Sequence, residues 1–226
     1  MPGQDAHRWG VLLDPEVPGR LKTGAANYFE TEENYPEVGP ETYRIRLSPT
    51  YTGRIGEFEV GDLFLKHARI NASPLLGARF CDHITFKAIK NYATPGAHFA
   101  GAYDSAISFL DTSSVLHPDR YTSACADSIH AQNFRIGPWV EGGLYEGQMD
   151  DAVNIYAIPS FVKEHLEPRI VLFHNYAMKD TQIGDRLVFF DPVSGIPVGS
   201  EGVESIKQVP AEQAWRVVLS GPVGPL

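Results

Sequence analysis

The sequence of 226 residues contains only two cysteines, Cys81 and Cys125, too few for a disulfide framework in a chain of this length. We therefore expect two buried thiols and a reducing compartment. No apolar run approaches the roughly 18 residues of a membrane-spanning helix. Residues 1–13 are polar and lack the apolar core of a signal peptide, so we expect a cytoplasmic or particle-associated protein that is not secreted by a signal peptide.

Clusters of positive charge are also missing. The chain has 19 Lys and Arg against 28 Asp and Glu, a formal net charge of −9, and its basic residues stand singly. Such a chain repels phosphate backbones and anionic lipid surfaces, so we expect neither nucleic acid nor a membrane as a partner. Because 43% of its residues are hydrophobic, it can still bury a core, which excludes a disordered chain.

Long helical periodicity is scarce, whereas apolar residues often alternate with polar ones. This pattern predicts a mainly β fold, a single β-barrel or β-sandwich domain with short helices and an extended N-terminal arm. Strands are expected at residues 43–47, 62–70, 83–89, 152–158, 169–178, 185–191 and 214–220. Short helices are expected at residues 118–131 and 160–166, and the segment 179–184 is expected to close a hairpin. No internal repeat is visible.

The first 42 residues read as an extended acidic arm that precedes a β-rich globular domain over residues 43–226. Five glutamates and no basic residue lie between Lys22 and Arg44, and Pro and Gly interrupt any helical period. One interpretation is a solvated loop. The other is an arm that docks on a protein partner or on another copy of the chain, because free termini are ordered only when something holds them.

Residues with metal-binding chemistry lie in two places. Cys81, His83, Cys125 and His130 offer thiolate and imidazole ligands for zinc, but their spacing matches no closed zinc motif. The loop with Glu141, Glu146, Asp150 and Asp151 offers oxygen ligands for calcium, but it lacks the spacing of an EF-hand. We therefore expect no metal and no cofactor.

Catalytic residues are not marked by any motif, since the sequence has no Gly-x-Ser-x-Gly elbow and no phosphate-binding glycine loop. The candidates are polar residues in apolar strands, namely His83, His174, Asn175 and Tyr176. A lone histidine in such a strand is either a hydrogen-bonded structural residue or a general base at the mouth of a barrel. Both interpretations stay open.

Three stretches resemble, in their order, SET-domain lysine methyltransferases. These are residues 53–65, 130–133 and 169–191, with Ile183-Gly184-Asp185 in the last. The resemblance implies an opening strand, a cofactor loop and a closing hairpin. The chain departs from that family because the Asn-His-Ser-Cys core is missing, and Phe189, Phe190 or Asp191 stands where the closing tyrosine is expected.

Two functions of different classes follow. The first is a non-catalytic structural or assembly subunit of a larger particle, such as a virion shell, neck or decoration component, which associates with itself or with protein partners through the arm. The alternative is an enzyme that acts on a small molecule within a β-barrel cavity, with an unknown reaction. A SET-like methyltransferase is a further alternative.

Overall fold

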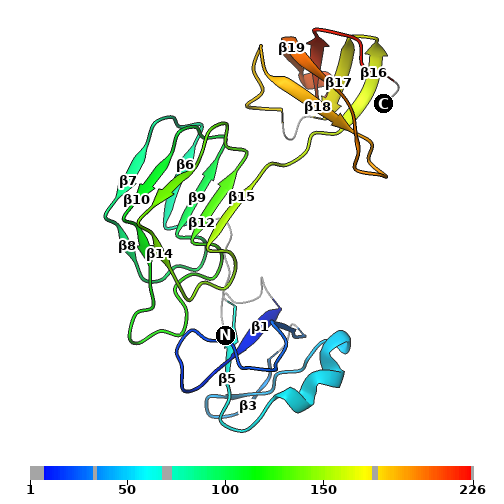
Figure 1. Ribbon diagram of the computed structural model, residues 1–226. Helices are drawn as coiled ribbons and strands as arrows, with labels where there is room; N and C mark the ends of the chain where they lie inside the picture. Colours follow the sequence, from blue (N-terminus) through cyan, green and yellow to red (C-terminus); the bar gives the residue numbers. More distant parts are fainter. Residues whose placement is uncertain (1–7, 33–34, 68–72, 175–177, 225–226) are drawn as a thin grey trace. The chain divides into compact units, whose positions relative to one another are not determined.

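The computed structural model describes residues 8–32, 35–67, 73–174 and 178–224 and divides into two compact units (Figure 1). The first unit is Met1–Tyr156 and the second is Ala157–Leu226. Strands dominate both units, which confirms the mainly β fold. No helix among the described residues is both long and apolar enough to span a bilayer.

The first unit begins with a small antiparallel sheet around one apolar cluster. The elements of this region are β1 (Trp9–Leu13), β2 (Phe29–Glu30), β3 (Glu37–Gly39), β4 (Thr42–Tyr43), the 3₁₀ helix η1 (Pro49–Glu57) and β5 (Leu63–Lys66). The small sheet consists of β2, β1 and β5, and β3 pairs with β4 separately. Strand β1 pairs with both β2 and β5. Leu12 and Phe29, both from the predicted arm, are buried together with Leu47. The described part of the arm therefore packs on residues 47–66 of its own chain.

The rest of the first unit is a coil of parallel strands. Three sheets are formed by β6 (Leu76–Arg79), β9 (Phe99–Ala102), β12 (Ile129–Gln132) and β15 (Val153–Tyr156); by β7 (Thr85–Lys87), β10 (Ser108–Leu110) and β13 (Trp139–Glu141); and by β8 (Lys90–Asn91), β11 (Ser113–Ser114) and β14 (Leu144–Tyr145). The chain visits the three sheets in the same order three times, and all neighbours run parallel. This is a parallel β-helix of three coils (Figure 1).

Stacking of equivalent residues builds the interior of the coil. Phe99 pairs in register with Ile129, and both are buried. Phe109 packs parallel to Phe86, with ring centroids 5.4 Å apart, and meets Phe99 edge to face at 4.6 Å. At one corner of the coil, left-handed backbone repeats: Phe80, Tyr103 and Asn133 have φ of 53°, 61° and 53° at the residue after β6, β9 and β12. The repeat therefore includes the turns.

The second unit is a five-stranded antiparallel sheet in the order β16-β17-β20-β19-β18. Its elements are β16 (Val162–Glu167), β17 (Ile170–His174), β18 (Arg186–Phe190), β19 (Pro197–Val209), the 3₁₀ turn η2 (Pro210–Glu212) and β20 (Ala214–Leu219). Alternate residues of these strands, including Val171, Phe173, Phe189, Val217 and Leu219, form one buried cluster. The alternation read from the sequence is confirmed here.

Several local predictions are wrong. Residues 118–131 are not helical, because they form a corner of the coil and β12, and residues 160–166 enter strand β16. The predicted hairpin does not form, since β17 pairs with β16 and β20 whereas β18 pairs with β19. The sequence also gave no sign of the repeat that the three coils form. Equivalent residues of the coils share a position in the stack, and the repeat does not depend on a shared residue type.

His98 lies in a corner of the coil and gives it a pH-dependent stability. Its side chain is 1% exposed, and neither ring nitrogen has a hydrogen-bond partner among the described residues. Burial lowers the pKa of His98 from 6.5 to about 4, because a charged imidazole would lose its hydration without compensation. The folded chain therefore binds this proton less readily than the unfolded chain does.

As the pH falls below 6.5, the unfolded state takes up the proton first, so stability declines until the pH reaches about 4. We expect the free energy of unfolding to fall by about 2.5 kcal/mol more between pH 7 and pH 4.5 in the wild type than in His98→Leu. Urea denaturation at both pH values measures this difference. Equal pH dependence of the two proteins would contradict it.

Candidate active site

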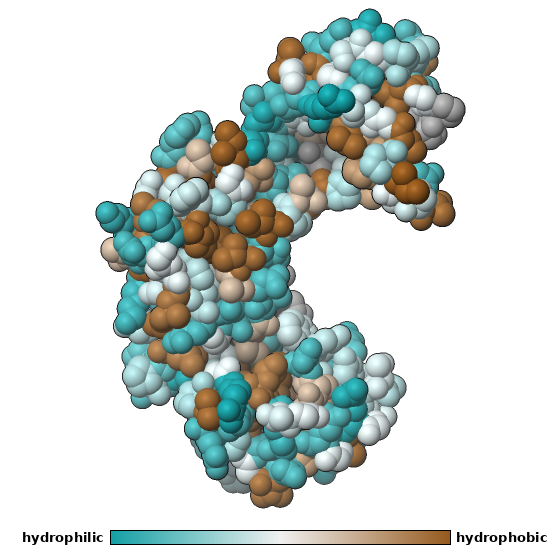
Figure 2. All heavy atoms as spheres, viewed as in Figure 1, coloured by the Kyte–Doolittle hydropathy of each residue, from teal (hydrophilic) through white to brown (hydrophobic). Residues whose placement is uncertain are grey.

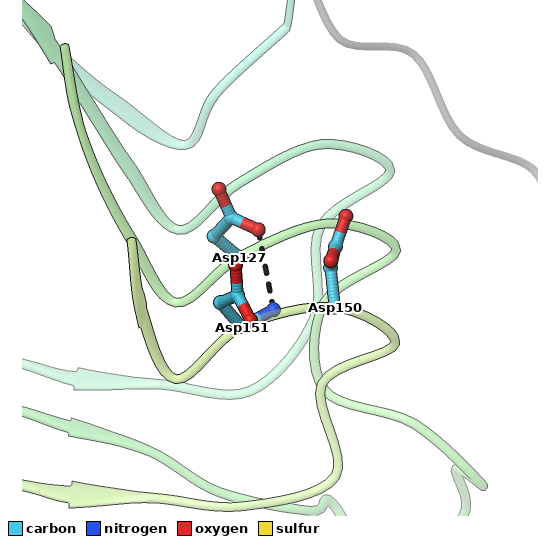
Figure 3. A group of neighbouring side chains, drawn as sticks. All are labelled: Asp127, Asp150 and Asp151. Atoms are coloured by element: carbon cyan, nitrogen blue, oxygen red, sulfur yellow. Dashed lines mark hydrogen bonds between the residues drawn. The ribbon is translucent and has the colours of Figure 1, made fainter. Parts of the chain in front are cut away.

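Three aspartates meet at one corner of the coil (Figure 3). Asp127 precedes β12 by two residues, and Asp151 precedes β15 by two residues. Because Ile129 pairs with Val153, extending this register by two residues places Asp151 beside Asp127. The bond from Ser128 N to the carbonyl oxygen of Asp151, 3.0 Å, confirms that the corner keeps the register. Asp150, the preceding residue, completes the group, and one carboxylate oxygen from each of the three lies within 4.8 Å of the others.

Asp127 is the anchored member of this aspartate trio. Its side chain is 1% exposed and shares a hydrogen bond with Nδ1 of His130. The backbone N–H of Asp151 donates to its Oδ1 at 3.3 Å, and Nδ2 of Asn154 donates to its Oδ2 at 3.4 Å. His130 is itself held by Tyr156, whose hydroxyl lies 3.1 Å from Nε2. Asp127 therefore has a fixed orientation, which suits a group that positions the exposed carboxylates beside it.

Asp150 and Asp151 are exposed, and Asp150 borders a pocket of about 1120 Å³ within the first unit. The pocket is also lined by the aromatic side chains Trp9, Tyr28 and Tyr51. The hydrogen bond with Tyr28, followed by burial, raises the pKa of the Tyr51 hydroxyl, so that hydroxyl stays protonated at neutral pH. Aromatic faces with a few polar groups are the usual lining of a small-molecule site.

Gln148 adds a polar group to this pocket. It lines the pocket just before Asp150, and its Oε1 is buried with no hydrogen-bond partner among the residues that the structure describes. A buried acceptor without a partner costs stability. The pocket combines carboxylates and aromatic rings. Chemically, the trio can donate and accept protons, or its oxygens can bind a divalent cation.

The four residues predicted as zinc ligands lie at two ends of one sheet. Cys81 and His83 follow the carboxyl end of β6, whereas Cys125 precedes the amino end of β12, and His130 is the second residue of β12. All strands of this sheet are parallel, so about 10 Å of strand separates the two pairs. The structure brings Asp127 to His130 instead.

Of the four predicted catalytic residues, the structure describes His83 and His174. His83 has a side chain that is 81% exposed and pairs with Asp82 at 2.9 Å. His174 is the exposed last residue of β17. Asn175 and Tyr176 lie outside the described residues. His83 and His174 belong to different units, and no shared site is described for them.

The stretches that resemble SET domains occupy separate parts of the structure. Residues 53–65 form the end of η1 and β5, residues 130–133 lie in β12 and its turn, and residues 169–191 lie in the second unit. None of the three aspartates lies in these stretches.

The residue that the sequence reasoning missed is Asp127. Asp150 and Asp151 stood among the candidate calcium ligands, but their partner lies 23 residues before Asp150. A signal was present: Asp127-Ser-Ile-His-Ala and Asp151-Ala-Val-Asn-Ile share an aspartate, a small residue, an aliphatic residue and a polar one before alternation continues. Neither the protein-family models nor the curated proteins include a match for this chain.

Three carboxylates at this distance repel one another, so the site should cost the fold stability. We expect Asp151→Asn to raise the free energy of unfolding by about 0.5–1 kcal/mol, because it removes one charge and keeps the backbone bond to Asp127. Asp111→Asn is the matched control, an exposed position of left-handed backbone where stability should stay unchanged. Thermal melts of the three proteins test this, and an equal loss of stability in both variants would refute it.

Proposed function

We propose that the first unit hydrolyses a glycosidic bond, with the aspartate trio as its acid–base machinery. The observation that carries the proposal is the convergence of one buried, anchored carboxylate and two exposed ones beside an aromatic-lined pocket. Glycoside hydrolysis needs a carboxylic acid that protonates the leaving oxygen and a carboxylate that assists the attack on the anomeric carbon.

The positions of the three aspartates suggest how the work is divided. Asp150 borders the pocket, so its carboxyl group is placed to give a proton to the glycosidic oxygen as the C–O bond breaks. Asp151 is exposed beside it, so its carboxylate is placed to attack the anomeric carbon, and carboxylate oxygens within 4.8 Å of each other suit this retaining arrangement. A water then cleaves the glycosyl ester and gives its proton to Asp150, which restores the acid, and the products are two sugars with free hydroxyl groups. The buried Asp127 accepts the backbone N–H of Asp151 and so positions that residue.

The lining of the pocket fits a carbohydrate. Trp9, Tyr28 and Tyr51 offer aromatic surface to the C–H face of a sugar ring. The aspartate trio lies at a corner of the parallel coil, where loops from successive coils stack.

The test is cleavage of a panel of chromogenic glycosides and oligosaccharides, followed through release of reducing ends. Asp150→Asn should lower the rate by about 10²–10⁴, because the amide cannot donate the proton. Asp111→Asn should cleave at the wild-type rate. An Asp150→Asn protein with undiminished turnover would exclude the proposed role. Cleavage lost in a chelator and restored by calcium would assign the trio to a cation instead.

An assembly role is a second candidate, and the open sheet edges favour it. Strands β13 and β7 end one sheet, and β14 and β8 end another, and no strand of the described residues pairs with their outer edges, so these edges can accept a further strand. Trp139 in β13 is 63% exposed and Leu144 in β14 is 55% exposed. Figure 2 shows hydrophobic atoms on the visible face of these stacked strands. Such edges support self-association.

Self-association through these edges predicts a concentration-dependent molar mass in light scattering. Trp139→Lys should shift the protein toward the monomer, because a charge on an edge strand opposes pairing with another chain. Val193→Lys is the control, since Val193 is a highly exposed residue of the second unit and belongs to none of these edge strands. A monomer at all concentrations would argue against the assembly role and leave the glycosidase proposal untouched.

A further inference from the structure

A second hollow of the first unit, of about 420 Å³, is lined by cationic side chains from two coils. Lys90 lies in β8 of the first coil and Tyr92 follows it, whereas His117 and Arg120 lie in the loop after β11 of the second coil. In a chain whose formal net charge is −9, this basic hollow is a local reversal of charge.

Tyr92 organises the basic groups around it. Lys90 Nζ stands 5.5 Å from the centroid of the Tyr92 ring, within the range of a cation–π contact. The ring of His117 meets Tyr92 edge to face, with centroids 5.5 Å apart and an interplanar angle of 82°. The bond from Arg120 N to the carbonyl oxygen of His117, 2.9 Å, turns the loop so that Arg120 returns to the hollow.

The two permanent cations of the basic hollow have no ion-pair partner among the described residues. Across the described ranges, no carboxylate oxygen comes within 4.0 Å of Lys90 or Arg120. The acidic group at this place is Asp119, whose Oδ2 lies 3.6 Å from Nδ1 of His117 and whose side chain is 87% exposed. A concave site with a lysine point charge and a planar guanidinium fork suits an oxyanion, which accepts from both.

We propose that the basic hollow binds an oxyanion, a carboxylate or sulfate ester, carried by a sugar unit of an acidic glycan. That a glycan carries the oxyanion rests on the proposed function; binding of the oxyanion does not. The basic hollow and the aspartate trio both lie where the chain passes from the sheet of β8, β11 and β14 to that of β9, β12 and β15. One extended substrate could therefore lie along this rim, with an acidic unit away from the bond that is cleaved.

The experiment is a set of calorimetric titrations with sodium sulfate, an oligogalacturonate and a neutral oligosaccharide of equal length. The ionic strength is the same for the three ligands, and the set is repeated at a higher salt concentration. We expect the oligogalacturonate to bind at least tenfold more tightly than the neutral chain, and the affinity to fall as salt is added. Replacing both cations in Lys90→Met/Arg120→Met should weaken its binding at least tenfold. Lys87→Met, which removes an exposed lysine of β7, is the matched control and should bind as the wild type does.

Each result tests a different part of the proposal: the site, the glycan or the cleavage reaction. Wild-type affinity in the double variant, with an unchanged melting temperature, would overturn the site; the single Lys90→Met variant serves if the double variant unfolds. Binding of sulfate with no preference for the oligogalacturonate would overturn the glycan and keep the oxyanion site. Asp150→Asn, whose cleavage should be slowed by about 10²–10⁴, allows binding of the oligogalacturonate to be measured without turnover. A wild type that binds the oligogalacturonate but cleaves no glycoside would reject the proposed function alone.

Discussion

Parallel hydrogen bonding between successive coils is the constraint on which the first unit depends. It places residues of equal position directly above one another, at the spacing of about 4.8 Å between paired strands. Inside the coil, this spacing brings Phe99 and Ile129 into one buried stack. At the corners, it repeats the left-handed residues and the loops. The contacts of a side chain in the coil therefore depend as much on the coils above and below it as on its own neighbours in the chain.

The same constraint explains why carboxylates lie so close together. Asp127 and Asp151 share a position in consecutive coils, and backbone bonds hold that position whether or not the charges favour it. Their repulsion is the kind of local cost that functional sites retain, because the rest of the fold stabilises them. The bonds of Asp127 to His130 and Asn154 fix one carboxylate and leave the exposed ones accessible.

Charges of opposite sign occupy the same rim of the coil. The aspartate trio lies in loops of the second and third coils, and the basic hollow is built from the first and second. In both cases, a loop residue acquires its partner from the neighbouring coil, as Tyr92 does with His117. A rim of stacked loops can therefore carry several chemically different positions along one direction, which suits an extended ligand.

The sequence by itself determined the class of the fold and many of its strands. Alternation of apolar and polar residues is a local property, so β15, β17, β18 and β20 could be read from it. Composition likewise determined the acidic character of the chain. These features need no knowledge of which segments meet.

Only the tertiary structure decided which strands pair, because alternation is the same in a barrel, a sandwich and a coil. The expected hairpin at residues 179–184 failed for this reason, as did the helix at residues 118–131, where short loop segments gain their bonds from the coils beside them. Asp127 could not be recognised from the sequence because its partners are 23 and 24 residues away along the chain. These residues become neighbours in space only when the coils stack in register.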